Sequence, residues 1–138
     1  IVFDLTITTP GLFSLKELFD LSLELNVHTF IKTTFAFDAS IVMCPQVLPR
    51  DLFEEVIDDV IDYIKPKLVG NEKFNYWITC LEDLKNREIG KEKYENYLSG
   101  IKLGKERLNI IDKWRNNDGV IDIIFDKNKK VSEWWKNI

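Results

Sequence analysis

The chain has 138 residues, enough for one domain that buries roughly two thirds of the surface exposed when it is unfolded. Hydrophobic residues make up 45% and charged residues 30%, which are proportions of a globular protein and exclude a disordered one. The net charge of −4 argues against nucleic acid as a partner, because binding phosphates requires a basic face.

The first 37 residues predict a strand, a helix and a second strand that runs parallel to the first. Residues 1–7 are rich in β-branched side chains, and a Pro-Gly turn follows them. Ser14 and Glu17 have the spacing of a capping box, so we expect Ser14 to cap a helix that stops at Asn26. Because the sequence opens inside a strand without an initiator Met, we also expect a further piece of sheet upstream.

Residues 27–37 predict the second strand, in which neither face is simply polar. Alternation places on one side Val27, Thr29, Ile31, Thr33, Phe35 and Phe37, and on the other side His28, Phe30, Lys32, Thr34 and Ala36. A strand of this kind is typical of a parallel sheet that is covered on both sides. An irregular apolar loop leads from this strand to residue 48.

Helical patterns predominate from Pro49 onward. Pro49 suits the first position of a helix, and the apolar stripe over residues 52–64 predicts the strongest helix of the chain. Further helices are expected over about 72–87 and 91–115. In the last of these, two glycines, Gly100 and Gly104, predict a kink or a close helix crossing.

The predicted fold class is therefore α/β, within a single domain, 1–138. A short parallel β-α-β unit and its loop occupy residues 1–48, and a mostly helical region occupies residues 49–138. Residues 120–125 fit either a short strand or one helical turn. Because a parallel pair of strands belongs to a larger sheet, the domain is expected to be a fragment of a larger α/β protein.

Ligands of parallel α/β proteins collect at the carboxyl ends of the strands. The candidate cofactor-binding residues are therefore the small and polar residues at these ends: Thr8, Thr9, Lys32, Thr34 and Ala36. Lys32 either reaches past the sheet edge or points into a polar cavity. Ordinary loop structure is the alternative interpretation of these positions.

The other titratable residues do not predict catalysis or metal binding. Asp58, Asp59 and Asp62 fall opposite the apolar stripe of their helix, which predicts a solvated face. His28, the only histidine, has no Ser or Cys nucleophile beside it in sequence. No catalytic residue is assigned, and no metal site is expected.

Cysteine usage and hydropathy predict a cytoplasmic protein. Cys44 and Cys80 are isolated from each other, which favours a reducing compartment and no disulfide framework. No apolar run approaches the roughly 20 residues of a membrane span, and no secretory leader pattern opens the sequence. A membrane partner is not expected.

Several short segments together form a family pattern: Ile7–Leu18, Phe35–Asp38, Met43–Pro45, Leu48–Arg50, Ile111–Arg115 and Glu133–Trp135. On these residues, nearly the whole chain resembles the C-terminal portion of radical SAM proteins, especially the twitch type of phage and environmental sequences. The resemblance implies that the two strands are the last two of a partial (β/α) barrel.

The resemblance also implies an enzyme that reductively cleaves S-adenosylmethionine at a [4Fe–4S] cluster. The family holds its cluster on a Cys-x3-Cys-x2-Cys motif, which this sequence lacks and which Cys44 and Cys80 do not replace. The chain is therefore expected to carry no cofactor itself. It would supply barrel wall and substrate-side loops, depend on a missing N-terminal part, and be inactive alone.

A small noncatalytic α/β module that binds other proteins is the alternative. The residues preceding residue 1 distinguish the two hypotheses, because the enzyme requires the cysteine motif there. Under either hypothesis, a two-stranded sheet leaves backbone groups unpaired along its edges and an apolar face with too few helices to cover it. We therefore expect self-association in which Val2–Ile7 or Ile31–Phe35 pairs across chains.

Overall fold

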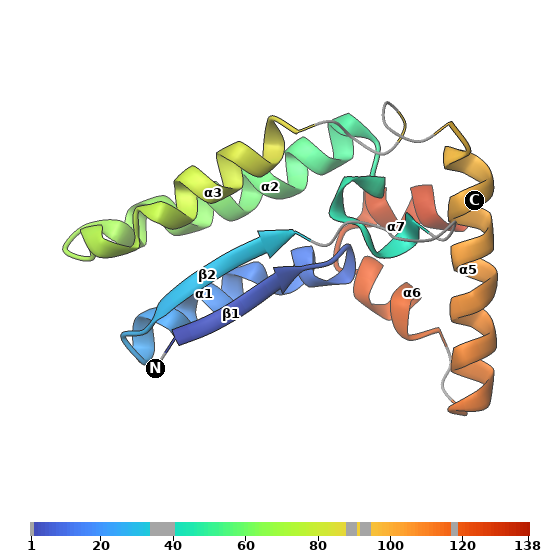
Figure 1. Cartoon of the computed structure of the whole chain (residues 1–138), viewed down its shortest axis with the longest axis horizontal. Helices are drawn as coiled ribbons and strands as arrows, with labels where there is room; N and C mark the ends of the chain where they lie inside the picture. Colours follow the sequence, from blue (N-terminus) through green and yellow to red (C-terminus); the bar gives the residue numbers. More distant parts are fainter. Residues whose placement is uncertain (1, 34–40, 88–90, 92–94, 117–118) are drawn as a thin grey trace.

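The computed structural model describes the whole chain except residues 1, 34–40, 88–90, 92–94 and 117–118 (Figure 1). Strand β1 (Val2–Ile7), the 3-10 helix η1 (Pro10–Ser14), helix α1 (Leu15–Glu24) and strand β2 (His28–Thr33) follow one another. The strands pair in parallel, with Val2 opposite His28 and Ile7 opposite Thr33. The predicted β-α-β unit is confirmed, and the expected continuation of the second strand to residue 37 lies outside the described residues.

The rest of the described chain is helical, as predicted. Its elements are the 3-10 helices η2 (Ile41–Met43), η3 (Pro45–Val47), η4 (Lys65–Leu68) and η5 (Glu72–Phe74), and the α-helices α2 (Arg50–Ile64), α3 (Tyr76–Lys85), α5 (Tyr97–Trp114), α6 (Val120–Phe125) and α7 (Lys129–Lys136). The ambiguous segment 120–125 is thus a helix. None of the described helices is long and apolar enough to cross a membrane.

The boundaries of α1 confirm one sequence signal and correct another. Asn26 has a φ of 53°, the left-handed conformation that ends the helical region. Ser14 directly precedes α1, but its side chain makes no capping hydrogen bond. The physical reason is that the backbone of Ser14 has φ −123° and ψ 9°, which is not the extended conformation from which an N-cap side chain reaches the free N–H groups of the first turn.

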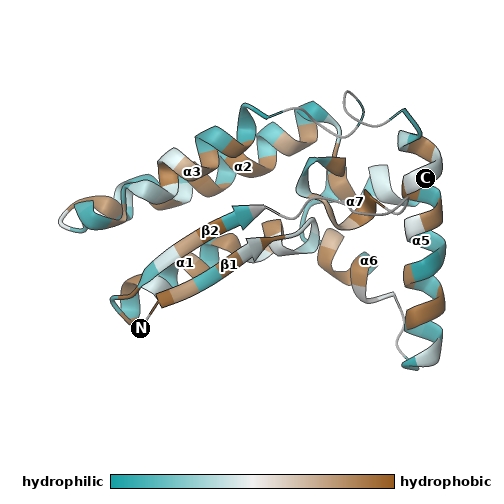
Figure 2. Cartoon of the chain, viewed as in Figure 1, coloured by the Kyte–Doolittle hydropathy of each residue, from teal (hydrophilic) through white to brown (hydrophobic). Residues whose placement is uncertain are grey.

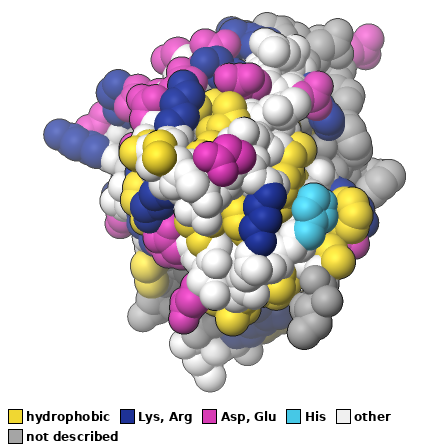
Figure 3. Space-filling model, turned by 90° about the vertical axis from the view of Figure 1, so that its left-hand side faces the viewer, with side chains coloured by type: hydrophobic (Ala, Val, Ile, Leu, Met, Phe, Trp, Pro, Cys, Tyr) yellow, Lys and Arg dark blue, Asp and Glu magenta, His cyan; other side chains and the backbone are white. Residues whose placement is uncertain are grey.

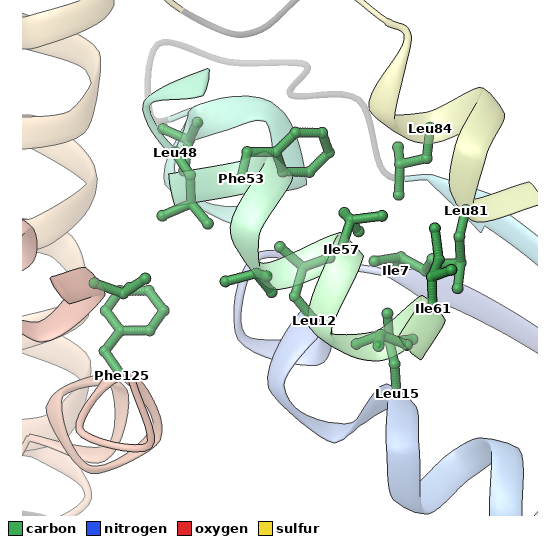
Figure 4. Close-up of a cluster of buried hydrophobic side chains, with 14 of the residues drawn as sticks. Ile7, Leu12, Leu15, Leu48, Phe53, Ile57, Ile61, Leu81, Leu84 and Phe125 are labelled. Carbon is green, nitrogen blue, oxygen red and sulfur yellow. The ribbon is translucent and has the colours of Figure 1, made fainter. Parts of the chain in front are cut away.

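One hydrophobic cluster joins the β-α-β unit to the helical region. In Figure 4, Ile7 of β1, Leu15 of α1 and Ile61 of α2 lie in this cluster, and Leu81 of α3 completes it. Each of these side chains is fully or almost fully buried. Burying one such side chain stabilises the fold by about 1.5–3 kcal/mol, so α1, α2 and α3 are held against the same side of the sheet.

The C-terminal helices extend this core. Phe125 of α6 contacts the rings of Phe13 and Trp135 edge to face, with centroids 5.5 and 5.2 Å away. Helix α5 packs on η2, and Gly100 and Gly104 of α5 are both buried. The kink or close helix crossing expected at these glycines stays a prediction.

Among the residues that the structure describes, the sheet is covered on one face only, which corrects an expectation from the sequence. Ile7 and Thr29 point to the helices and are buried, whereas Phe30 on the opposite face is 56% exposed. Two parallel strands joined by one crossover place their helix on a single side, and α2 and α3 pack on that side too. Figure 2 shows hydrophobic residues along the strands as well as within the helices.

Candidate functional site

The uncovered side of the sheet, called the open face below, is the candidate site. Strand alternation places six side chains on it: Val2, Asp4, Thr6, His28, Phe30 and Lys32. All six residues are exposed. Figure 3 views the molecule from the end at which β1 begins and shows the histidine beside hydrophobic side chains. The open face therefore combines apolar, acidic and basic side chains on the surface of two paired strands.

An ion pair crosses the open face between the two strands. The Nζ atom of Lys32 lies 2.6 Å from Oδ2 of Asp4. The pair is diagonal, because Asp4 stands opposite Phe30 in the register. Both side chains are more than half exposed, and an ion pair of this kind contributes only about 0–1 kcal/mol to stability. Both charged groups remain accessible to a ligand.

Aromatic rings hold the amino-terminal end of β2. The ring of His28 lies 5.0 Å from that of Phe30 and 4.4 Å from that of Tyr76, measured between centroids. The hydroxyl of Tyr76 accepts a 2.8 Å hydrogen bond from the backbone N–H of Thr29. These contacts hold helix α3 against the outer edge of β2.

A groove of about 640 Å³ lies between the outer edge of β2 and α3. It is lined by Ile31, Lys32, Thr79, Cys80, Asp83, Leu84 and Arg87. Burial raises the pKa of the Cys80 thiol, and the nearby carboxylate of Asp83 raises it further. A raised pKa disfavours the thiolate, so Cys80 is not an activated nucleophile.

The structure gives the predicted site residues different environments. Thr9 is fully buried, and its hydroxyl donates to the carbonyl oxygen of Cys44. The hydroxyl of Thr8 accepts from the N–H of Gly11 at 3.2 Å. Both hydroxyls therefore hold the loop that follows β1. Lys32 lies on the open face, and its ammonium group is available there.

Two of the predicted residues, Thr34 and Ala36, lie outside the described residues. Sequence reasoning missed Asp4, the partner of Lys32, and Tyr76, which binds the backbone of β2. The sequence did contain a signal for Asp4, because an acidic residue within a strand rich in β-branched residues is uncommon. The sequence contained no signal for Tyr76, since this residue belongs to a helix that is far from β2 in the sequence.

The described residues do not fit an iron–sulfur cluster. Cys44 is buried, and its thiol donates to Oε1 of Gln46 at 2.9 Å. Among the residues that the structure describes, no group of three His, Cys, Asp or Glu side chains is arranged to hold a metal ion. A cluster takes about four ligands, mostly thiolates, so its ligands would have to come from outside this set.

Comparison with known proteins finds no matching family model, no matching curated sequence and no matching solved structure.

Proposed function

We propose that the chain is the C-terminal part of a cytoplasmic radical SAM-like enzyme and is inactive by itself. One observation carries the proposal: the two strands are parallel, their helices pack on one side, and the other side of the sheet is open. A strand pair in a (β/α) barrel has this arrangement, with helices outside and the inner face toward the cavity. The resemblance of the sequence to radical SAM proteins supplies the class of enzyme.

In such a barrel wall, the open face would border the substrate cavity. Asp4 and Lys32 would then present opposite charges to the cavity, and Phe30 would present an apolar surface beside them. Charged groups on rigid strands orient a polar substrate at little entropic cost. The role proposed for these residues is to bind and orient substrate, while the rest of the enzyme supplies the cluster.

The test compares this chain with the longer protein of which it is proposed to be a part. Both are reconstituted with iron and sulfide without oxygen, and the release of 5′-deoxyadenosine from S-adenosylmethionine is measured. We expect the longer protein to be active and the 138-residue chain to be inactive. If the longer protein has no Cys-x3-Cys-x2-Cys motif ahead of this chain, the proposal is wrong.

Matched substitutions test the open face in the longer protein. Lys32→Met removes the charge on the open face, and Lys129→Met removes a charge from a different exposed ion pair, that with Glu133. We expect Lys32→Met to lower product formation by about tenfold or more, equivalent to about 1.4 kcal/mol of lost stabilisation. Lys129→Met should leave it unchanged. Equal activity of the two variants would show that the open face does not bind substrate.

A noncatalytic protein-interaction module is the second candidate. The observation in its favour is exposed apolar surface next to sheet edges that pair with no third strand among the described residues, notably at Val2 and Phe30. In this case Val2–Ile7 or Ile31–Phe35 would pair with a strand of another chain. Hydrogen exchange measured at rising protein concentration tests this: pairing requires increasing protection of the β1 or β2 amides, and constant protection would exclude it.

A further inference from the structure

The C-terminal half of α5 carries an apolar stripe that no other part of the described chain covers. Ile110, Ile111 and Trp114 are 48%, 39% and 82% exposed. With the half-buried Leu103 they follow the spacing of a single helix face, which the charged Arg107 shares. Figure 2 shows this hydrophobic stretch in the half of α5 that leads toward α6.

The N-terminal half of the same helix behaves differently. Tyr97 and Ile101 are buried, as are the two glycines between which Ile101 stands. The helix thus uses one face for its own core and presents a second face to solvent. Exposed apolar residues grouped at helical spacing are typical of a helix that pairs with another helix.

The charges beside the stripe indicate which helix pairs with it. Glu106 and Lys113 are exposed and lie two helical turns apart, so they occupy the same border of the stripe. If two copies of α5 pack antiparallel, Glu106 of each copy lies opposite Lys113 of the other. A parallel pair would instead place Glu106 beside Ile111 of the second copy, so the opposite charges of Glu106 and Lys113 would not meet.

We propose that α5 pairs antiparallel with α5 of a second copy of this chain, forming a twofold-symmetric dimer. Ile110 lies near the twofold axis, and Trp114 packs over Leu103 of the second copy. Two identical Glu106–Lys113 pairs flank this seam, as a symmetric interface requires. The interface is independent of the open face and does not rest on the proposed function.

Sedimentation velocity over a range of protein concentrations tests the dimer. We expect the wild-type chain to change from monomer to dimer as concentration rises. Trp114→Ala should raise the dissociation constant by about tenfold or more, because Trp is the most exposed and largest anchor of the stripe. Val69→Ala truncates an equally exposed apolar residue outside α5 and should leave the dissociation constant unchanged.

Charge reversal provides the sharper test, because both positions are exposed and folding should be retained. Glu106→Lys and Lys113→Glu should each weaken the dimer by placing like charges across the seam. The double variant restores opposite charges and should regain most of the wild-type affinity. A wild-type chain that stays monomeric at all concentrations, or a double variant no tighter than the single variants, would overturn the proposal.

Discussion

The buried hydroxyl of Thr9 donates a 2.7 Å hydrogen bond to the carbonyl oxygen of Cys44. The backbone N–H of Thr9 donates to the neighbouring carbonyl oxygen of Met43 at 3.0 Å. Two adjacent carbonyl groups of the loop before α2 are thus bound by one residue at the end of β1. This connection holds the carboxyl end of β1 against the helical region.

Replacing Thr9 by Val should therefore destabilise the fold. The substitution keeps the shape of the side chain but leaves the buried carbonyl oxygen of Cys44 without this donor, at a cost of about 1–3 kcal/mol. Urea unfolding followed by circular dichroism measures the loss. Thr9→Ser retains the hydroxyl and is the control, since it should lose less than Thr9→Val.

Two capping positions should respond differently to Ala. Asn128 precedes α7, and its Oδ1 accepts a 3.2 Å hydrogen bond from the N–H of Val131. Asn128→Ala should lower the free energy of unfolding by about 1 kcal/mol. Ser14→Ala should change it by less than about 0.5 kcal/mol, because Ser14 makes no capping bond. The same urea titrations compare both variants with wild type, and an equal loss at the two positions would contradict the structure.

Local signals in the sequence predicted the elements and their order well. The left-handed Asn26 and the apolar stripe of α2 each act through neighbours a few residues away, so a sequence pattern records them. The capping box failed although its residues are present, because the backbone of Ser14 does not take the extended conformation of an N-cap. A local pattern indicates what a residue is able to do, and the backbone conformation decides whether it does so.

Long-range relationships were not predictable in the same way. Thr9 looked like a ligand-binding residue at a strand end, but the acceptor of its hydroxyl lies 35 positions further along the chain. The sequence also did not show which face of the sheet is left open. Whether Phe30 is covered depends on which side α2 and α3 pack, and no residue of β2 itself determines that.

Acid should weaken the contact between α1 and the end of α2. Burial raises the pKa of Asp20, but hydrogen bonds from Lys67 and Tyr63 outweigh it, so the pKa lies below its usual value of 3.8. The Nζ of Lys67 lies 2.6 Å from Oδ1 of Asp20. A carboxylate with a lowered pKa stabilises the fold above the pKa of the unfolded state, and the stabilisation disappears as pH falls through the folded pKa.

Asp20→Asn tests this dependence. The variant should be less stable than wild type at neutral pH, by a modest amount because Asp20 and Lys67 are both partly exposed. The difference between the two proteins should shrink as the pH falls below 3.8. Unfolding curves measured at a series of acidic pH values give this difference directly. A difference that stays constant over the series would show that the charge of Asp20 contributes nothing.

Alkaline pH should weaken the packing of α5 through Tyr97. Burial raises the pKa of Tyr97 from 10.0 to about 12, and its hydroxyl donates a hydrogen bond to the carbonyl oxygen of Val47. A phenol with a raised pKa contributes stability that is fully present below the unfolded pKa and is lost as pH rises through the folded pKa. Between pH 10 and 12 the unfolded chain releases this proton before the folded chain does, so stability falls with rising pH.

Tyr97→Phe separates this titration from that of the other tyrosines. At neutral pH the variant should be less stable than wild type by about 1–3 kcal/mol, because the carbonyl oxygen of Val47 loses its buried donor. Its stability should then fall less steeply than that of wild type from about pH 10 to 12, since the raised pKa is gone. The free energies of unfolding of the two proteins should therefore converge at high pH. If the free energy of unfolding falls equally steeply with pH in both proteins, Tyr97 ionises as an exposed tyrosine does. In that case the hydroxyl of Tyr97 is not buried between α5 and η3.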